Sequence, residues 1–303
     1  MLKSTITELT NYIEFQNEMN RLSKIEYHSY EKTMKEIGIS YLGECNKSAK
    51  LTHNGKKNML TYGIYLASSD ASNINVCPKS KMCRESCLVG SGYAKIDALA
   101  HNNKVLNARI VKTRLFFANR NLFMMLLIKE INRAINKAKR LGMEFSVRLN
   151  CTSDINPTVF VYEGKNILEL YPNISFYDYT KVKSHWKVAE KYPNYYITFS
   201  RDGSKENEEE CLEWLRRGNN VAVVFGVTKV SELPKKWKGY DVLIGDDYDY
   251  RVWDKLQEGK QIVGLIYKVS KNDFDEDENG IHHFKGIPNS PFIIQKDDKD
   301  CEY

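Results

Sequence analysis

The chain has 303 residues, of which 42% are hydrophobic and 28% are charged, a profile typical of a globular protein rather than a disordered one. Lysine and arginine outnumber aspartate and glutamate by 45 to 39, and the net charge of +6 permits a phosphate-bearing partner without requiring one. No apolar run approaches the roughly 20 residues that span a bilayer, and the polar N-terminal sequence has no apolar core of a secretory signal. We therefore expect no membrane contact and a cytoplasmic location.

The first part of the chain is expected to be helical and then extended. Residues 1–40 carry loosely periodic apolar positions among charges, which indicates helices. The polar stretch around Asn46, Asn54 and Gly55 is expected to be a turn or loop. The segment that follows, MLTYGIYLAS, has the β-branched and aromatic content of a strand.

Residues 98–141 form the longest helical pattern in the chain. They contain no proline, and their apolar side chains recur at i, i+3 and i+4. We expect a break near Asn119 that divides the region into two helices. Gly142 is expected to end the second helix as a C-cap glycine.

Strands and helices alternate in the pattern from there to about residue 268. The segments NVAVVFG, DVLIGD and QIVGLIYK are nearly all apolar, as strands covered on both faces are. About seven strands, including the one before the cysteine cluster, predict an α/β fold built as a full or partial (β/α) barrel of parallel strands, the TIM-barrel arrangement. An open doubly wound sheet is the alternative, because periodicity does not separate the two.

This pattern divides the chain into three parts. Residues 1–40 are expected to be an N-terminal helical segment, and residues 41–272 the barrel-like domain. Residues 273–303 are expected to be a polar C-terminal tail that forms a surface hairpin or a loosely ordered end.

Three of the seven cysteines lie close together: Cys77, Cys83 and Cys87 follow the pattern C-x5-C-x3-C. A secreted disulfide scaffold is short, dense in cysteine and even in its cysteine count, so a metal or redox site in a reducing compartment fits this chain better. Three thiolates leave one iron of a [4Fe–4S] cluster open, whereas a closed structural zinc site needs four ligands. We therefore predict an iron–sulfur cluster. The alternatives are zinc, with His53, His101 or another cysteine as fourth ligand, and three unrelated cysteines.

Polar side chains stand where the predicted strands end. The functional groups of parallel βα folds lie at these ends, where arginine and lysine bind anions and carboxylates bind ribose hydroxyls or move protons. The pattern predicts a concave site for a phosphate-bearing or nucleoside-like ligand. Its candidate catalytic residues are Asp154, Asp178 and Lys181, and its candidate substrate-binding residues are Arg148, Asn150, Ser200, Asp246, Asp249 and Arg251.

Several of these residues also have a purely structural interpretation. Asp154 and Ser200 are suited to capping a helix, and the acidic group at 246–249 is typical of a solvated turn. The basic helix expected in the segment ARIVKTRLFFANR also has both a functional and a structural interpretation. Its arginines and lysine, interleaved with Phe116 and Phe117, suit nucleic-acid contact, but the favoured interpretation is an amphipathic helix with buried aromatics and a solvated charged face.

Residues from about 40 to 270 resemble the phage-encoded proteins of the gene product 88 type. The matching pieces run in order along the chain: LTYGIYLAS, NVCPKSKMCRESCL, ARIVKTRLFF, VRLNCTSDI, FYDYTK, YYITFS, NVAVVF, IGDDYDYR and IVGLIYK. The resemblance implies a phage protein, and hence the cytoplasm of a bacterial host, but no particular activity.

A remoter resemblance is to radical-SAM-like iron–sulfur barrel proteins of phages and mobile elements. Those proteins carry a cysteine triplet near the first strand, and NCTSD and YDYTK are similar to two of their later strand ends. The resemblance implies that Cys77, Cys83 and Cys87 hold a [4Fe–4S] cluster whose open iron binds S-adenosylmethionine (SAM). The spacing here is C-x5-C-x3-C, where those proteins have C-x3-C-x2-C, so the resemblance speaks more directly for the cluster than for SAM cleavage.

Three hypotheses about function follow. The first is a radical-SAM-like enzyme that acts on a nucleotide or nucleic acid. The second is a non-enzymatic iron–sulfur protein that binds nucleic acid in phage replication or regulation. The third is a zinc protein with a hydrolytic or structural metal. The sequence does not define the oligomeric state.

Overall fold

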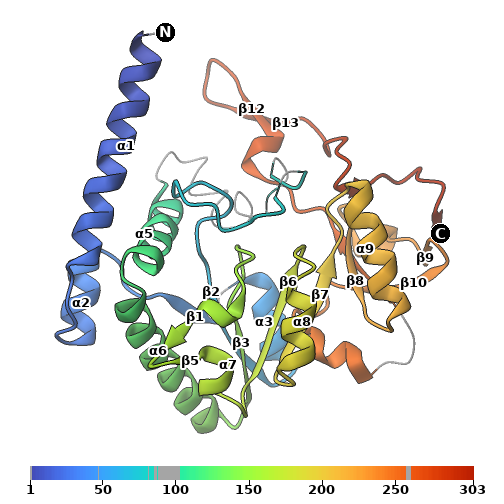
Figure 1. The fold of residues 1–303 in the computed structure, drawn as a ribbon. Helices are drawn as coiled ribbons and strands as arrows, with labels where there is room; N and C mark the ends of the chain where they lie inside the picture. Colours follow the sequence, from blue (N-terminus) through green and yellow to red (C-terminus); the bar gives the residue numbers. More distant parts are fainter. Residues whose placement is uncertain (1, 47, 81, 85–86, 88–102, 257–260) are drawn as a thin grey trace.

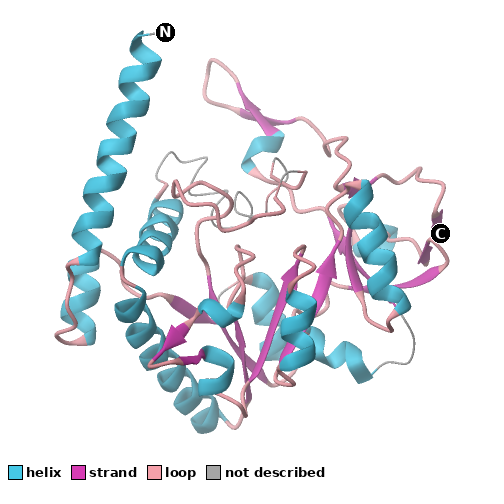
Figure 2. Ribbon diagram, viewed as in Figure 1, coloured by secondary structure: helices cyan, strands magenta, loops and turns pink. Residues whose placement is uncertain are grey.

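The protein is described here by a computed structural model, which defines residues 2–303 except 47, 81, 85–86, 88–102 and 257–260. Within these residues an eleven-stranded sheet forms the centre of the molecule. Helices pack against the sheet, and loops gather above the tips of its strands (Figure 1). Figure 2 shows the same view coloured by secondary structure.

The N-terminal segment is helical, as the sequence predicted. It contains α1 (Leu2–Ser23) and α2 (Tyr30–Ile37). The Ser29 side chain caps α2 by accepting a hydrogen bond from the Lys32 amide, and Gly38 ends the helix with a left-handed conformation at φ 91°. Both helices contribute to the main apolar core through Leu22 and Met34.

The expectation of a loop around Asn46, Asn54 and Gly55 is wrong in part, because α3 (Ala49–Lys56) occupies this stretch. Ser48 caps the helix by accepting a hydrogen bond from the Leu51 amide. The polar sequence does not indicate this helix, because it lacks a clear apolar stripe. One of the contacts that hold the helix is made instead by the buried Asn54 side chain.

Seven strands of the sheet are parallel, in the order β2–β3–β6–β7–β8–β11–β10. The first five strands of this order follow the order of the chain, and β11 then lies between β8 and β10. No pairing joins the two ends of this order in the described residues. The bounds of the parallel strands are β2 (Met59–Ile64), β3 (Glu144–Arg148), β6 (Ser175–Thr180), β7 (Tyr195–Ser200), β8 (Val221–Phe225), β10 (Tyr240–Ile244) and β11 (Gln261–Ile266).

Short strands complete the two edges of this sheet. At one edge, β1 (Gly43–Cys45) runs antiparallel to β2; at the other, β9 (Lys236–Trp237) runs antiparallel to β10 and to β15 (Cys301–Glu302). In addition, β14 (Ile293–Ile294) pairs with β8. The predicted α/β class with a largely parallel sheet is therefore confirmed, and the sequence did not predict the antiparallel edges.

The predicted division of the long helical region is also confirmed. The helix α5 ends at Ala118 and α6 begins at Arg120, and the Asn119 side chain between them caps α6 by accepting a hydrogen bond from the Leu122 amide. Gly142 ends α6 with φ 64°. The helices after α3 are α5 (Lys104–Ala118), α6 (Arg120–Leu141), α7 (Ile167–Leu170), α8 (His185–Lys191) and α9 (Lys205–Arg216).

The remaining elements are short. The segments Val230–Glu232 and Arg251–Leu256 are 3-10 helices, and the tail forms the expected hairpin, β12–β13. No described helix is both long and apolar enough to span a bilayer. The bounds are η2 (Pro157–Val159), β4 (Val161–Tyr162), β5 (Lys165–Asn166), η3 (Val230–Glu232), η4 (Arg251–Leu256), η5 (Lys271–Asp273), β12 (Phe274–Glu276) and β13 (His282–Phe284).

The two faces of the sheet differ in polarity. One face carries residues such as Phe176 and Phe199, which pack into the main apolar core with Trp186 of α8. The opposite face, here called the inner face, carries alternate residues of the same strands and is much more polar. On it the hydroxyl groups of Thr61 and Ser146 lie 2.8 Å apart. The inner face is covered by α3 and by residues 246–256, which bond to it as described below.

Candidate metal centre

The cysteine segment lies at the carboxyl edge of the parallel sheet. It follows β2, and Figure 1 shows its described part above the tips of β6 and β7. The amide of Asp154, in the loop after β3, donates a hydrogen bond of 2.8 Å to the carbonyl of Val76, next to Cys77. The segment is therefore attached to the strand ends where functional groups of parallel folds gather.

The three clustered thiols are half-buried, and each meets only a weak acceptor. The Sγ of Cys77 lies 3.8 Å from the Thr152 carbonyl, and the Sγ of Cys83 lies 3.7 Å from the Ser80 carbonyl. The Sγ of Cys87 lies 3.5 Å from the hydroxyl of Ser68. A thiol is a poor hydrogen-bond donor, so these contacts hold the sulfur atoms only loosely.

The ammonium group of Lys181, the residue after β6, interacts electrostatically with all three thiols. Burial disfavours its ammonium form, but Cys83, Asp154, Cys77 and Cys87 together raise the pKa of Lys181 above its ordinary value. Each thiol therefore lies within electrostatic reach of the same ammonium group.

The Lys181 ammonium itself has no hydrogen-bond or ion-pair partner in the part of the chain that the structure describes. Its Nζ lies 5.5 Å from the centre of the Phe292 ring. A cation in this position favours negative charge on neighbouring sulfur atoms.

The protonation of the thiols depends on the balance between burial and this cation. Burial raises the pKa of Cys77 to about 12 and also raises the pKa of Cys83, whereas Lys181 lowers both. At neutral pH Cys77 therefore carries its proton. A metal ion that binds it must displace that proton.

Asp154 connects the ends of β3 and β6. Its carboxylate accepts hydrogen bonds from the Thr180 hydroxyl at 2.7 Å and from the Lys181 amide at 2.8 Å. The Nδ1 atom of His185 lies 3.5 Å from the same carboxylate. The structure thus brings together two of the three predicted catalytic residues, Asp154 and Lys181, beside the cysteines.

The third predicted catalytic residue, Asp178, is buried on the face of β6 that carries Phe176, opposite the inner face. Its carboxylate accepts hydrogen bonds from the Asn150 amide at 2.7 Å, the Asn150 side chain at 3.1 Å and the Tyr195 hydroxyl at 3.3 Å. Burial raises the pKa of Asp178 to about 7, although Arg148 and the two Asn150 donors lower it. The Asn150 side chain also bonds the backbone of Ile155, so both residues hold the loop after β3.

Arg148 and Asp249, predicted to bind substrate, bind each other on the inner face. The Nη1 atom of Arg148 lies 2.8 Å from both carboxylate oxygens of Asp249, which is fully buried. Asp249 also accepts a 2.8 Å hydrogen bond from the Tyr177 hydroxyl. Asn54 of α3 accepts the amide hydrogen bonds of Asp249 and Tyr250, so the helix that the sequence analysis missed fixes this pair.

The other three predicted substrate-binding residues are also engaged within the protein. Arg251 is fully buried, donates to the Tyr248 carbonyl and faces Asp254 at 3.6 Å. Asp246 forms an ion pair of 2.9 Å with Lys268. Ser200 is buried at the end of β7.

The basic helix predicted as a possible nucleic-acid surface is α5 and the start of α6. Lys112 is buried, and Phe116 lies in the core. Arg114 forms an ion pair with Glu18 of α1, and Arg120 donates a 2.5 Å hydrogen bond to the Val159 carbonyl. These cations are tied to the protein's own groups, which agrees with the structural interpretation of an amphipathic helix.

Arg109 is a residue whose position the sequence reasoning missed. Its Nη1 atom is buried and has no hydrogen-bond partner among the residues that the structure describes. Burial lowers the pKa of Arg109, while Tyr65, Cys151 and Cys87 raise it, which places a second cation beside the cysteine segment. The sequence signal for this position is that Arg109 follows the cysteine segment in the chain and lies on the face of α5 that also carries buried residues.

The proposed fourth ligands for zinc have different positions. The Nδ1 atom of His53 bonds the Asp246 carbonyl at 2.8 Å. His101, like Gly90 and Gly92 of the cysteine segment, lies outside the described residues. Among the residues that the structure describes, no three His, Cys, Asp or Glu side chains are already arranged as metal ligands.

The fold and this site define an α/β protein with a largely parallel sheet, whose carboxyl edge carries three cysteines and a half-buried lysine that interacts with them. A model of the gene product 88 family matches residues 41–273, well over half of the chain. The chain therefore belongs to the gene product 88 family, as its sequence motifs suggested. No curated protein and no solved structure matches it.

Proposed function

We propose that this protein is an iron–sulfur protein in which Cys77, Cys83 and Cys87 hold a [4Fe–4S] cluster. The observation that carries the proposal is the shared interaction of all three thiols with Lys181 at the carboxyl edge of the sheet. Thiolate sulfur is the ligand that iron–sulfur clusters use. Lys181 and Arg109 would offset the negative charge of a thiolate-bound cluster.

The form of the proposal that the site favours is a radical-SAM-like enzyme acting on a nucleotide or nucleic acid. With three protein thiolates, the cluster would supply reducing electrons and an open iron for SAM. Asp154 and Lys181 would face the reaction space, where the carboxylate accepts hydrogen bonds from substrate hydroxyls and the ammonium binds an anionic group. Asp178 and Asn150 would act as positioning residues, because their bonds hold the loop that carries Asp154.

The first experiment is anaerobic purification and reconstitution, followed by measurement of iron, sulfide and zinc. The expected result is a brown protein with absorbance at about 400 nm and about four iron atoms per chain. Replacing Cys77, Cys83 or Cys87 by alanine should abolish this absorbance, and Cys301→Ala should keep it, because Cys301 lies in β15 at the far edge of the sheet. Stoichiometric zinc without iron, or loss of iron in the Cys301 variant alone, would overturn the proposal.

A second experiment separates the enzyme from an iron–sulfur protein that only binds nucleic acid. The reconstituted, reduced protein is incubated with SAM, and 5′-deoxyadenosine is measured. Its formation supports the enzyme. A protein that holds the cluster and forms none of it, but binds DNA or RNA with an affinity that falls steeply with salt, would instead be the non-enzymatic alternative.

A further inference from the structure

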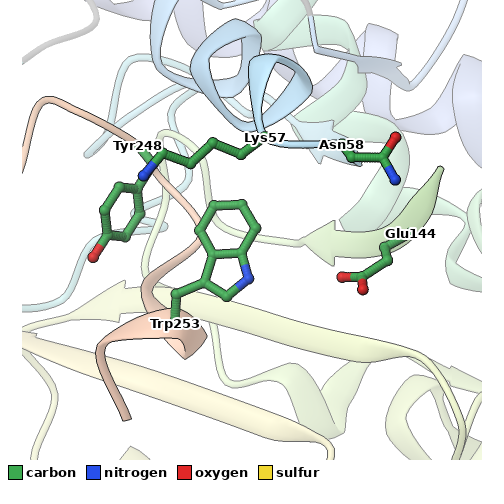
Figure 3. A pocket seen from close by; sticks show the side chains of 5 residues that line it. All are labelled: Lys57, Asn58, Glu144, Tyr248 and Trp253. Carbon is green, nitrogen blue, oxygen red and sulfur yellow. The ribbon is translucent and has the colours of Figure 1, made fainter. Parts of the chain in front are cut away.

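A cavity lies at the amino-terminal ends of the parallel strands, where β2 and β3 begin. Its volume is about 370 Å³, within the range of small-molecule sites. Figure 3 shows the five side chains that line it: Lys57, Asn58, Glu144, Tyr248 and Trp253. They come from four places in the chain: the residues between α3 and β2, the first residue of β3, the segment after β10, and η4. The cysteine site uses none of them.

One wall of this cavity is aromatic and held in place. The ring of Trp253 packs edge-on against Tyr248, with ring centres 5.3 Å apart, and against Tyr250 at 5.0 Å. The Tyr248 hydroxyl donates a 2.6 Å hydrogen bond to Asp254, and the Tyr250 hydroxyl bonds Ser175 at 2.7 Å. Trp253 is half-exposed while its neighbours are fixed, so it offers a preformed surface on which a planar ring can stack.

The other wall carries acceptors. In Figure 3 Glu144 and Asn58 lie across the cavity from Tyr248. Glu144 is exposed, and its carboxylate has no hydrogen-bond or ion-pair partner within the described part of the chain. Asn58 uses its amide nitrogen to donate to the Gly142 carbonyl at 3.3 Å, which leaves its side-chain oxygen as an acceptor. A ligand that fits this wall must present hydrogen-bond donors.

Lys57 gives the cavity a positive end. Its Nζ lies 4.4 Å from the centre of the Tyr248 ring and 5.8 Å from that of Trp253. The ammonium makes no ion pair with a described residue. It disfavours a cationic ligand such as an arginine side chain, which the carboxylate and the indole would otherwise suit. The same ammonium favours a ligand that carries an anion next to its ring.

We propose that this cavity binds a guanine nucleotide. Guanine is the nucleobase whose pairing edge presents two adjacent N–H donors, and these match the two oxygens of the Glu144 carboxylate. Adenine and cytosine place a ring acceptor beside their amino group, and uracil flanks its single N–H with two carbonyls, so each would set an acceptor against that carboxylate. The base stacks on Trp253, and the phosphate meets Lys57.

Trp253 provides the readout. The other three tryptophans, Trp186, Trp214 and Trp237, are buried, so a ligand in the cavity quenches mainly Trp253. The experiment titrates the purified chain with GMP, AMP, CMP and arginine amide, following tryptophan fluorescence and, separately, binding heat. We expect GMP to bind at least about tenfold more tightly than AMP, CMP or arginine amide, because a ligand without guanine's two donors and phosphate loses a charged hydrogen bond to Glu144 or the attraction of Lys57.

Variants test the roles of the individual groups. Glu144→Gln should weaken GMP binding about tenfold or more and reduce the preference over AMP, whereas the matched control Glu209→Gln, an exposed residue of α9, should change neither. Lys57→Met should bring the affinity for GMP close to that for guanosine. Binding of arginine amide more tightly than GMP, equal binding of GMP and AMP, no GMP binding at millimolar concentration, or an unchanged Glu144→Gln variant would each overturn the proposal. None of these outcomes depends on the metal content.

Discussion

Two groups of buried and half-buried charged residues in this molecule differ in how their charges are balanced. On the inner face, Arg148 and Asp249 hold each other at 2.8 Å, and Tyr177 supplies a further hydrogen bond to the carboxylate. At the carboxyl edge, the Lys181 ammonium interacts with three weakly bonded thiols and has no hydrogen-bond partner within the described residues. The carboxylate of the first group has a direct ion pair, whereas the ammonium of the second makes no ion pair with a residue that the structure describes.

This difference distinguishes charged residues that stabilise the fold from charged residues that prepare a binding site. A buried ion pair such as Arg148–Asp249 stabilises one arrangement of the chain, and removing one member leaves the other uncompensated. A half-buried cation that interacts with thiols and with the nearby Asp154 carboxylate, without a direct ion pair to a described residue, contributes little to folding, but it favours the thiolate form in which those thiols bind a metal. The two groups should therefore respond differently to the same kind of substitution.

The largest expected effect is on stability, at the Arg148–Asp249 pair. Arg148→Met leaves the fully buried Asp249 without its cation, and we expect the free energy of unfolding to fall by about 3–5 kcal/mol. Urea unfolding at pH 7 measures the loss. Arg217→Met, which breaks an exposed pair with Glu190 and Glu213, is the matched control and should cost at most about 1 kcal/mol.

A double variant makes this test more specific. Adding Asp249→Asn to Arg148→Met removes the uncompensated charge and should restore part of the lost stability. If Arg148→Met cost no more than Arg217→Met, the inner pair would not be structural, and Arg148 would return as a candidate for binding substrate.

The next effect is a change in how stability depends on pH, at Asp178. The pKa of this carboxyl is about 7 in the folded protein and about 3.9 in an unfolded chain. The folded state therefore holds the proton more tightly, and its stabilising contribution is present below pH 4 and is lost as the pH rises to about 7. The full contribution is at most about 4 kcal/mol, at about 1.4 kcal/mol for each pKa unit.

Asp178→Asn removes this titration. The free energy of unfolding of the wild type should exceed that of the variant by more at pH 5 than at pH 8, as measured by urea unfolding at both values. The exposed Asp297→Asn control should show no such difference. A larger advantage of the wild type at pH 8 would mean that the Asn150 and Tyr195 donors keep Asp178 ionised throughout.

Much of the fold was predictable from local pattern. Helical spacing located α5 and α6 and the break at Asn119, and near-continuous apolar runs located β8 and β11. Because parallel strands present their carboxyl ends at one edge, the sequence also placed Asp154 and Lys181 together. Each of these predictions rests either on residues that are close together in the sequence or on the common direction of parallel strands.

Features that depend on distant partners were not predictable. Arg148 and Asp249 are 101 positions apart, and the segment that carries Asp249 turns back over the inner face after β10. Nothing in either local sequence shows that they meet. The insertion of β11 between β8 and β10, and the cavity formed by Lys57, Glu144 and Trp253, likewise arise from pairings between separate segments.

The smallest expected effect on folding, and the sharpest contrast with Arg148, is at Lys181. Lys181→Met keeps the length of the side chain and the backbone amide that bonds Asp154, and it removes a half-buried cation that has no hydrogen-bond partner among the described residues. We expect the metal-free variant to unfold within about 1 kcal/mol of the wild type, because the Asp154 carboxylate keeps its hydrogen bonds from the Thr180 hydroxyl and from the backbone amide of residue 181. Its affinity for a thiolate-bound metal should fall about 10–100-fold, since a group next to the ligands tunes them.

Competition with a chelator measures this affinity for Zn²⁺, and retention of iron during gel filtration measures it for the reconstituted cluster. Lys183→Met, two residues away and paired on the surface with Glu213, is the control and should leave both unchanged. A Lys181 variant as unstable as Arg148→Met, with unaltered metal affinity, would place Lys181 among the structural charges. The distinction between the two groups would then fail, because an ammonium group without a hydrogen-bond partner would be stabilising the fold rather than preparing the cysteines.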